Sequence, residues 1–326
     1  MEDSLLPTEQ KGKIVSKQPK ISIVIVNYNT GKLLENCLES IHSTPCDVLD
    51  KVVVIDNDSK DGSADFLKQQ DKIILISNQE NLGFGKACNQ GAALISADYI
   101  LFLNPDTIIS SEAMLALVGR LSAADNKKIA VCGLKQVDQN NNVSRHCCDF
   151  PNLTNFLSRS VGITSIFPRL GYVLGNWDHL DSREVNHVIG SCYAIRRDVF
   201  EGLNGFDERF FLYYEDLDLS KRVAMAGWNI LYHADHHLQH FCGGSSKKVP
   251  VIRLFRSLQS KIIYADKHLG STQAHLLLTV NVLFELPIRC LLCILFLSPS
   301  NLKSTIFAFT LLLNWFVRVG LARDKN

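Results

Sequence analysis

The sequence predicts an α/β protein with an open, doubly wound, mostly parallel sheet and a helical C-terminal extension. Short apolar runs rich in β-branched residues recur between residues 21 and 133, and nearly every position in them is apolar. Such runs are typical of strands covered on both faces. Segments with helical periodicity separate these runs, so strands and helices alternate. With 326 residues, the chain is long enough for one large domain or two ordinary ones.

The first part of the chain is expected to supply five strands and four helices. The expected strands are 21–27, 51–56, 72–77, 99–104 and 128–133. The expected helices are 31–43, 61–70, 84–96 and 111–123, with Asn29 or Thr30, Ser59 and Ser110 as N-caps. In such a sheet, ligands bind at the carboxyl ends of the strands.

The pattern weakens from residue 134 to about 185, where loop and short helix are expected. Further on, the sequence predicts strands at 185–195 and 229–235 and helices at 196–203 and 215–227. A Gly/Ser-rich turn at 240–246 and an amphipathic helix at 250–268 follow.

Composition excludes several classes of protein. The chain has 34 basic and 33 acidic residues and a net charge of +1, which argues against binding nucleic acid through a basic surface. The ten cysteines are scattered, and the C-x-x-C at Cys290–Cys293 lies in an apolar run, so they are predicted to be buried thiols in a reducing compartment. Residues 1–20 are polar and lack a signal-peptide core, which predicts a loose tail and a cytoplasmic location.

Three apolar runs occur near the C-terminus, at 276–284, 290–297 and 306–317. None reaches the roughly 20 unbroken apolar residues of a spanning helix. Basic residues flank or interrupt them: Arg289, Lys303, Arg318 and Arg323. The pattern favours helices lying on an anionic membrane surface; a buried subdomain, a dimer interface and a true span are the alternatives.

Polar residues follow three of the expected strands. The three groups are Asn27-Tyr28-Asn29, Asp56-Asn57-Asp58 and Asn104-Pro105-Asp106. Tyr28 offers a stacking face, and the carboxylate of Asp56 can accept hydrogen bonds from a base or ribose. Asn and Asp also end strands and cap helices, but three such groups at one sheet edge favour a ligand site.

The segment from Asn81 to Asn89 contains two glycines, Gly83 and Gly85. It is not a dinucleotide fingerprint, because Cys88 replaces the third glycine and the segment follows the third strand. We expect these glycines to let the backbone approach a ligand closely.

Oxygen ligands point to a hard divalent cation. Asp106 lies in a short loop after a buried strand, which suits Mg²⁺ or Mn²⁺ bridging phosphates. His240 can ligate such a metal or hydrogen-bond a phosphate, although the spacing does not single it out among its neighbours His233, His236 and His237.

Five acidic residues lie before and at the start of the helix expected at 215–227. The N-terminus of a helix favours ionised carboxylates, as a general base requires. We predict that Asp216 is the base, with Glu215 beside it and Asp218 structural.

As an ordered set over residues 21–268, these motifs resemble family 2 inverting glycosyltransferases of the GT-A fold, closest to the rhamnosyltransferase-like branch. The resemblance implies that Tyr28, Asp56, Gly83, Asn89 and Asn104 line the nucleotide site. It also implies that Asp106 and His240 bind the metal and that Asp216 is the catalytic base. Many members have aspartate where this chain has Asn104, which bears on the strength of metal dependence.

The same resemblance implies a catalytic domain at 21–249, with a nucleotide half at about 21–133 and an acceptor half at 134–249, and C-terminal helices at 250–326. Substrate contacts are expected from Glu215, Gly190, Ser191 and Trp177. Trp177 could equally be a core residue.

The expected reaction moves a sugar, best guessed as L-rhamnose from a dTDP or UDP donor, to a glycan or lipid-linked glycan at the inner membrane face. A homo-oligomer is compatible with the sequence. The alternatives are another sugar-nucleotide enzyme, such as a nucleotidyltransferase, and a non-catalytic glycan-binding subunit.

Overall fold

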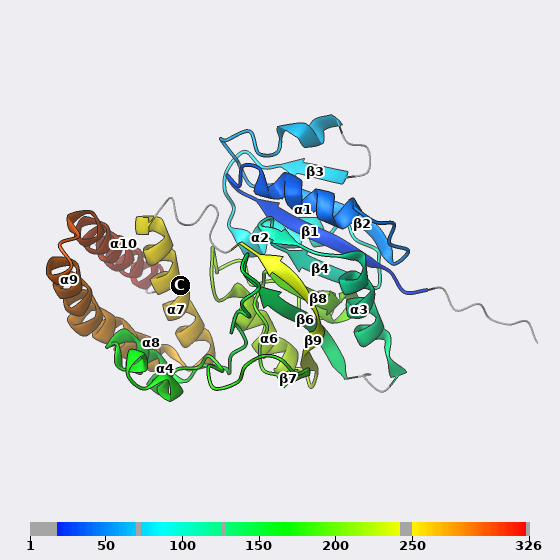
Figure 1. The fold of residues 1–326 in the computed structure, drawn as a ribbon. Coiled ribbons are helices and arrows are strands. Elements are labelled where there is room, and N and C mark those ends of the chain that lie inside the picture. Colours follow the sequence, from blue (N-terminus) through cyan, green and yellow to red (C-terminus); the bar gives the residue numbers. More distant parts are fainter. Residues whose placement is uncertain (1–17, 70–72, 125–127, 242–249, 324–326) are drawn as a thin grey trace, which may run out of the picture.

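The computed structural model describes residues 18–69, 73–124, 128–241 and 250–323. Within these residues, nine strands form one sheet in the order β3-β2-β1-β4-β8-β6-β9-β5, with β7 paired to β9 (Figure 1). The strands are β1 (Ile21–Asn27), β2 (Leu49–Asp56), β3 (Ile73–Ser77), β4 (Tyr99–Leu103), β5 (Thr107–Ile108), β6 (Ile129–Val137), β7 (Arg183–Val185), β8 (Cys192–Arg196) and β9 (Asn229–His240).

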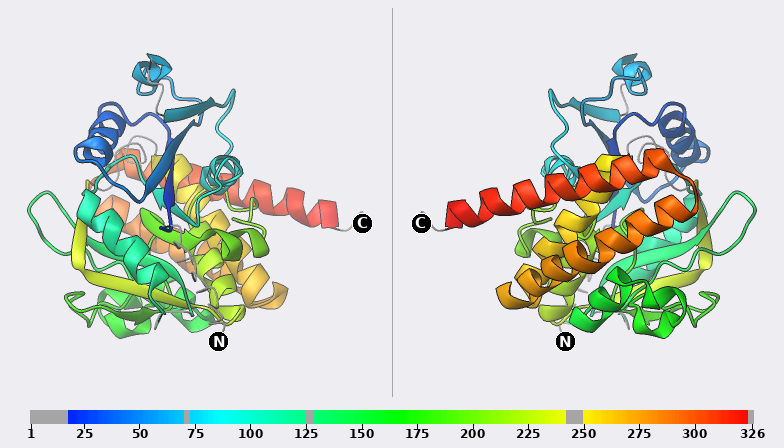
Figure 2. Two further views of the ribbon diagram at one scale, coloured as in Figure 1. Left: turned by 90° about the vertical axis from the view of Figure 1, so that its right-hand side faces the viewer. Right: turned by 90° about the vertical axis from the view of Figure 1, so that its left-hand side faces the viewer.

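Helices cover both faces of the sheet and form a separate group at one end of the molecule (Figures 1 and 2). The α-helices are α1 (Leu33–His42), α2 (Phe84–Ala92), α3 (Ser111–Ser122), α4 (Leu153–Ser160), α5 (Arg197–Gly202), α6 (Glu215–Met225), α7 (Pro250–His268), α8 (Ser271–Val280), α9 (Leu286–Leu295) and α10 (Pro299–Arg323). The other helical segments are η1 (Asp65–Gln69), η3 (Ile163–Ser165), η4 (Pro168–Leu170) and η6 (Asn281–Glu285), a π-helix.

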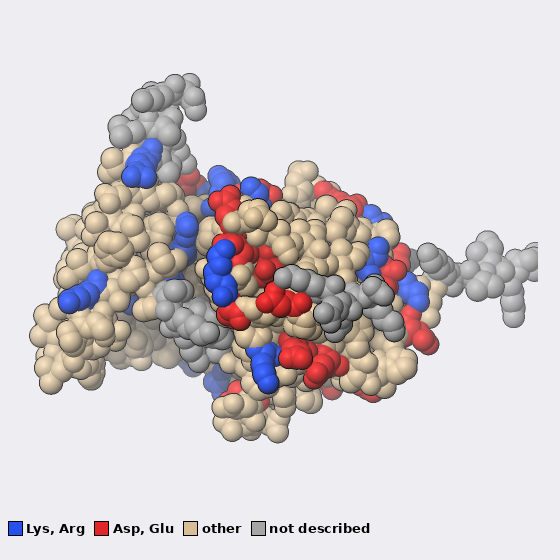
Figure 3. All heavy atoms as spheres, turned by 90° about the horizontal axis from the view of Figure 1, so that it is seen from above, with Lys and Arg blue, Asp and Glu red and all other residues tan. Residues whose placement is uncertain are grey.

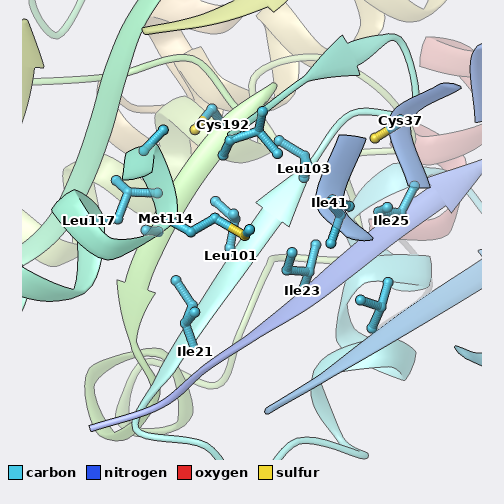
Figure 4. Packing of buried hydrophobic residues seen from close by; sticks show 14 of the residues in the cluster. Ile21, Ile23, Ile25, Cys37, Ile41, Leu101, Leu103, Met114, Leu117 and Cys192 are labelled. Carbon is cyan, nitrogen blue, oxygen red and sulfur yellow. The ribbon is translucent and has the colours of Figure 1, made fainter. Parts of the chain in front are cut away.

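Strand β1 shows how the sheet is covered on both faces. Its odd-numbered residues, including Ile21 and Ile23, pack with α1 and α3, as the close-up in Figure 4 shows. The even-numbered Val24 and Val26 belong to a second core with residues of α2 and α6. This alternation follows from the two-residue period of a strand, and it confirms the predicted double-sided burial.

The sheet is mixed rather than wholly parallel. Strands β3, β2, β1 and β4 are parallel, but β8 is inserted antiparallel between β4 and β6. The expected strand at 185–195 is therefore wrong as one element. Its beginning, β7, pairs with β9, while its end, β8, pairs with β4 and β6, and residues 186–191 form a loop between them.

Two other local predictions need correction. The helix expected at 61–70 is only the short η1, and β9 runs five residues beyond the predicted end at 235. Ser110 caps α3 as predicted, by accepting from the backbone N–H of Ala113. Asn29 and Thr30 do not cap α1, whose N-cap is Lys32 without a side-chain bond; the hydroxyl of Thr30 donates to Asn27 instead.

Helices α4, α7, α8 and α10 share a third hydrophobic core with Phe210 and Leu217, which come from the segment leading into α6 and from α6 itself. The C-terminal helices are therefore packed against the sheet domain. The continuous helical segment Ser271–Leu295 is long and apolar enough to cross a membrane by length and composition alone, with a mean hydropathy of 1.9.

Candidate active site

The strand-end polar groups lie at one edge of the sheet, and the side-chain amides of two of them, Asn27 and Asn57, are hydrogen-bonded within the protein. Asn27 is buried, and its amide donates to Asp56 Oδ1 at 2.9 Å, to Ser59 at 3.0 Å and to Ser63 at 2.9 Å. Its Oδ1 accepts from Thr30. Asn27 therefore ties the end of β1 to the loop after β2.

Asn57, directly after β2, also ties neighbouring loops together through its side-chain amide. Its Nδ2 donates to Asn81 Oδ1 at 2.9 Å and to the carbonyl of Gly83 at 3.2 Å, and its Oδ1 accepts from the N–H of Leu82 and from Asn78. This buried amide shapes the glycine loop that precedes α2.

Tyr28 and Asp56, the two predicted nucleotide contacts, lie beside these bonded amides. Tyr28 is 36% exposed, so its ring is open to a ligand. The side chain of Asp56 is half-buried and is oriented by Asn27. The loops are thus held in place while these two side chains remain accessible.

The glycine loop contacts the segment before α6. Gly83 has φ +88°, and a Cβ there would lie 2.5 Å from the carbonyl oxygen of Phe211, so this close approach requires glycine. The N–H of Phe84 donates to the same carbonyl at 2.8 Å. Asn89 accepts from the N–H of Phe206 and donates to its carbonyl, both at 2.9 Å. Asn89, predicted to line the nucleotide site, therefore has its amide engaged with backbone.

Asp106 and His240 are brought together by the register of two strands. Thr107 of β5 pairs with His240 of β9, and the N–H of Phe241 donates to the carbonyl of Asp106 at 2.9 Å. His240 Nε2 lies 3.3 Å from Asp106 Oδ1. Gly243 and Ser245 of the motif that follows lie outside the described residues.

Gln136 links this pair to Ser191. Its Oε1 lies 2.9 Å from His240 Nδ1, and its side chain contacts the hydroxyl of Ser191 through Nε2 at 2.7 Å and Oε1 at 3.0 Å. Because Oε1 is an acceptor, Nδ1 of His240 carries a hydrogen, and Nε2 is directed at Asp106.

The fold family implies a divalent cation, and this donor set fits one. His240 Nε2 and Asp106 Oδ1 lie 3.3 Å apart, and an imidazole nitrogen and a carboxylate oxygen are both common ligands of divalent cations. Mg²⁺ is commonly bound by one or two carboxylates with phosphates and waters completing its shell. Within the described residues no group of three or more His, Cys, Asp or Glu side chains is arranged to hold a metal, so substrate oxygens and water would supply the other ligands.

Asp216 is connected to the metal-binding candidates through two consecutive residues. Its Oδ2 accepts from the N–H of Gly190 at 2.7 Å. The carbonyl of the next residue, Ser191, accepts from the N–H of Asn104 at 3.0 Å, two residues before Asp106. A Cβ on Gly190 would lie 3.1 Å from Asp216 Oδ2, so the approach is close. The structure thus brings Asp106, His240, Gly190, Ser191 and Asp216 together.

Glu215 and Asp218 have contrasting surroundings on α6. Glu215 is buried, its Oε2 has no hydrogen-bond partner, and burial together with the charge of Asp216 raises its pKa well above the ordinary value. Asp218 is fully buried and contacts Arg222 at 2.8 Å, Lys267 at 2.6 Å and His268 at 2.7 Å. It joins α6 to the end of α7, the structural role predicted for it.

Two consecutive tyrosines before α6 have a left-handed backbone, with φ +68° at Tyr213 and +67° at Tyr214. Bulky residues seldom adopt this conformation, which costs about 1–3 kcal/mol per residue. Contacts with α7 hold the segment: Ser260 donates to the carbonyl of Leu212 at 2.8 Å, and the ring of Tyr264 lies 5.8 Å from that of Tyr214. Helix α7 therefore helps to place Asp216.

Trp177 lies in a different set of contacts. Its ring stacks on His179 with centroids 4.0 Å apart, the guanidinium of Arg183 lies 4.2 Å from its centre, and its N–H donates to Asp181 at 2.7 Å. These contacts hold the indole against residues 179–183, and the sugar contact of Trp177 stays a prediction.

The sequence-based analysis did not single out Gln136 or His187. Gln136 comes from β6, and His187 lies 3.7 Å from Asp216 in the loop after β7. Gln136 follows Lys135 and lies beyond the strand expected at 128–133, so the pattern offered no signal for it. Nothing in the spacing around His187 marks it.

Comparison with known proteins gives a family match. The model of Glycosyl transferase family 2 matches residues 22–203, more than half of the chain. An N-acetylglucosaminyl-diphospho-decaprenol L-rhamnosyltransferase of Mycobacterium tuberculosis is 28% identical over 277 residues, covering 80% of this chain and 89% of that protein. The O-antigen chain rhamnosyltransferase RfbN of Salmonella typhimurium is 30% identical over 236 residues, covering 68% and 66%.

Two solved structures share the architecture. A mannosyltransferase from Pyrobaculum calidifontis, solved with GDP-Man and Mn²⁺, has a TM-score of 0.53 at 14% identity, covering 91% of this chain and 87% of that one. GalNAc-T7, solved with UDP, GalNAc and Mn²⁺, has a TM-score of 0.54 at 14% identity, covering 80% and 55%. At these identities the likeness establishes the fold, which is GT-A.

Proposed function

Because this chain belongs to glycosyltransferase family 2 and is a glycosyltransferase, we propose that it is an inverting rhamnosyltransferase. The proposed donor is dTDP-L-rhamnose, and the proposed acceptor is a hydroxyl of a lipid-linked glycan. The names of its relatives support this choice of sugar. The observation that carries the proposal is the link from Asp216 through Gly190 and Ser191 to Asp106 and His240, because a base and a diphosphate site are needed side by side.

The proposed reaction is a single displacement. Asp216 accepts the proton of the acceptor hydroxyl as its oxygen attacks the anomeric carbon. The nucleoside diphosphate leaves from the opposite face of the sugar, so the anomeric centre is inverted. Tyr28 and Asp56 hold the base and ribose. Asp106 and His240 would hold a Mg²⁺ or Mn²⁺ ion, which supplies positive charge to the diphosphate when bound.

The test is a panel of sugar nucleotides with a polyprenyl-diphosphate glycan acceptor. We expect dTDP release with dTDP-L-rhamnose and a product whose anomeric configuration, read by NMR, is inverted. Turnover with a UDP-sugar but not with dTDP-L-rhamnose would show that the donor is a UDP-sugar. Release of pyrophosphate would indicate a nucleotidyltransferase, and donor binding without turnover would indicate a non-catalytic subunit.

The cation has a separate test. Mn²⁺ binding in the presence of dTDP, followed by electron paramagnetic resonance, is expected for the wild-type protein and lost in Asp106→Ala. EDTA should abolish turnover, and Mg²⁺ or Mn²⁺ should restore it. Full activity in chelator would remove the metal role from Asp106 and His240.

We further propose that α8, α9 and α10 bind the inner face of the cell membrane. They lie together on one side of the molecule (Figure 2, right), and large apolar side chains there are exposed, including Leu291, Leu295 and Phe296. Residues 271–323 contain four lysine or arginine residues and one acidic residue, Glu285. Seen from above, this end of the molecule carries little acidic surface (Figure 3).

Vesicle flotation tests this attachment. We expect binding to vesicles containing phosphatidylglycerol and a clear loss in Leu291→Glu/Leu295→Glu. A matched control is Leu115→Glu, an exposed leucine on α3 of the sheet domain. Substitution is preferable to truncation near Ala274, since truncation also removes Leu277 and Phe309, which are buried in the core with α7. Equal flotation of all variants would contradict the proposal.

A further inference from the structure

His187 lies beside the proposed catalytic base. It is 5% exposed and belongs to the loop between β7 and β8 that also contains Gly190. Its Nε2 is 3.7 Å from Asp216 Oδ2, the oxygen that accepts the Gly190 N–H at 2.7 Å. One loop therefore presents two groups to the same carboxylate oxygen.

The other ring nitrogen of His187 contacts the first of two linked, buried hydroxyls. Nδ1 lies 2.9 Å from Ser220 Oγ, which in turn lies 3.1 Å from the hydroxyl of Tyr193. Ser220 and Tyr193 are both fully buried. A serine has one hydrogen to donate, so the direction of this chain determines which nitrogen of His187 carries hydrogen.

The carboxylate selects one direction. Burial lowers the pKa of His187 and opposes the effect of the neighbouring Asp216, so the ring is neutral and carries one hydrogen. With Tyr193 donating to Ser220 and Ser220 donating to Nδ1, that hydrogen is on Nε2 and faces Asp216. The opposite direction would set the Nε2 lone pair against a carboxylate oxygen, which is repulsive.

We propose that His187 is a positioning residue for Asp216: as the Nε2–H tautomer, fixed by Ser220 and Tyr193, it orients the carboxylate and favours its ionised form. The effect on turnover rests on the proposed function, whereas the tautomer does not. The contact is longer than a hydrogen bond in this structure, and catalytic contacts commonly shorten when substrate binds.

The other titratable groups around Asp216 come from several elements. They are Glu215 on α6, Cys148 after β6, Tyr172 before β7 and Tyr193 on β8. Burial raises the pKa of each of these four groups and so favours their neutral forms, and none of the four can carry a positive charge. His146 is also neutral, because burial lowers its pKa to about 3, and His187 is among the groups that lower it further. Among the residues that the structure describes, backbone N–H groups of Gly190 and Leu217 donate to Asp216.

Two substitutions separate the two nitrogens. The amide N–H of glutamine reaches the position of Nε2, while that of asparagine reaches only the position of Nδ1. We expect His187→Asn to lower kcat about tenfold, with little change in the donor KM, and to move the acidic limb of kcat/KM about one pH unit upward. His187→Gln should remain within about threefold of wild type, with the limb in place. Equal losses in both variants with an unmoved limb would overturn the positioning role.

Nitrogen-15 NMR of histidine-labelled protein tests the tautomer without any substrate. The signal of His187, identified by its absence in His187→Gln, is expected to show the Nε2–H form. Ser220→Ala should shift it toward a mixture of tautomers. A pure Nδ1–H signal in the wild-type protein overturns the proposal. If the wild-type protein transfers no sugar but shows the Nε2–H form, the proposed function fails and the assigned tautomer stands.

Discussion

The ends of β1 and β2 and the start of α6 use buried polar groups in opposite ways. At the strand ends, the amides of Asn27 and Asn57 are buried and bonded to neighbouring loops. At the start of α6, Glu215 is buried with Oε2 unpartnered, and the side chain of Asp216 is 15% exposed. Buried polar groups are normally hydrogen-bonded. The bonded amides therefore form a scaffold, whereas Glu215 leaves an unpartnered carboxyl oxygen beside Asp216, the proposed base.

Replacing the proposed base tests the α6 side of this contrast most strongly. Asp216→Asn keeps the side-chain shape but cannot accept a proton, so kcat should fall about 10³-fold. Thermal stability and dTDP binding should be nearly unchanged. The contrast predicts that this variant loses turnover but keeps dTDP binding. Unchanged turnover would show that Asp216 is not the base.

The strand-end side should respond in stability. Asn27→Ala removes donors to Asp56, Ser59 and Ser63 in a buried site, so the free energy of unfolding should fall by about 2–3 kcal/mol. Urea denaturation measures this loss. A loss below about 0.5 kcal/mol would show that Asn27 does not hold the loops.

Tyr28 is the matched neighbour, one residue along and exposed. Tyr28→Ala should weaken dTDP binding about tenfold, as expected for loss of one stacking contact, and leave Tm unchanged. Isothermal titration calorimetry and thermal unfolding measure the two effects. The opposite pattern, a lower Tm with normal binding, would exchange the roles assigned to Asn27 and Tyr28.

The smallest effect is expected from Glu215. Its raised folded-state pKa means that folding takes up a proton, so this group costs stability as pH rises above its ordinary value of 4.5. Glu215→Gln cannot titrate and should match wild type near pH 5. It should become progressively more stable than the wild type as pH rises from 5 to 8, read as a growing difference in Tm. A constant difference across this range would mean that Glu215 is ionised in the folded protein.

The local pattern was sufficient to predict β1, β2, β4, α3 and α7, and it put Asp106 after a buried strand and Asp216 at a helix start, where the structure has them. Those elements depend on burial of short consecutive segments, which periodicity records directly. The antiparallel insertion of β8 and the pairing of Thr107 with His240 depend on partners about 90 and 130 residues away, which no local pattern encodes.

The side chains of the candidate site also depend on contacts with residues far away in the sequence. The sequence predicts that Asn89 and Trp177 lie near a ligand site. Their orientation depends on distant backbone, such as Phe206, and on loop neighbours, such as His179. Gln136 and His187 act through residues on other strands and helices, so they become recognisable only when the fold is known.

The left-handed turn at Tyr213 and Tyr214 sets a lower limit on the length of any active fragment. The family match ends at residue 203, thirteen residues before the proposed base, yet the backbone that carries this base is held by Ser260 and Tyr264 of α7. A fragment that ends with β9 lacks α7, so the turn would lose these contacts and Asp216 would no longer be held beside Gly190. On the proposed mechanism, we expect the shortest active piece to extend through His268, whose Nε2 lies 2.7 Å from Asp218.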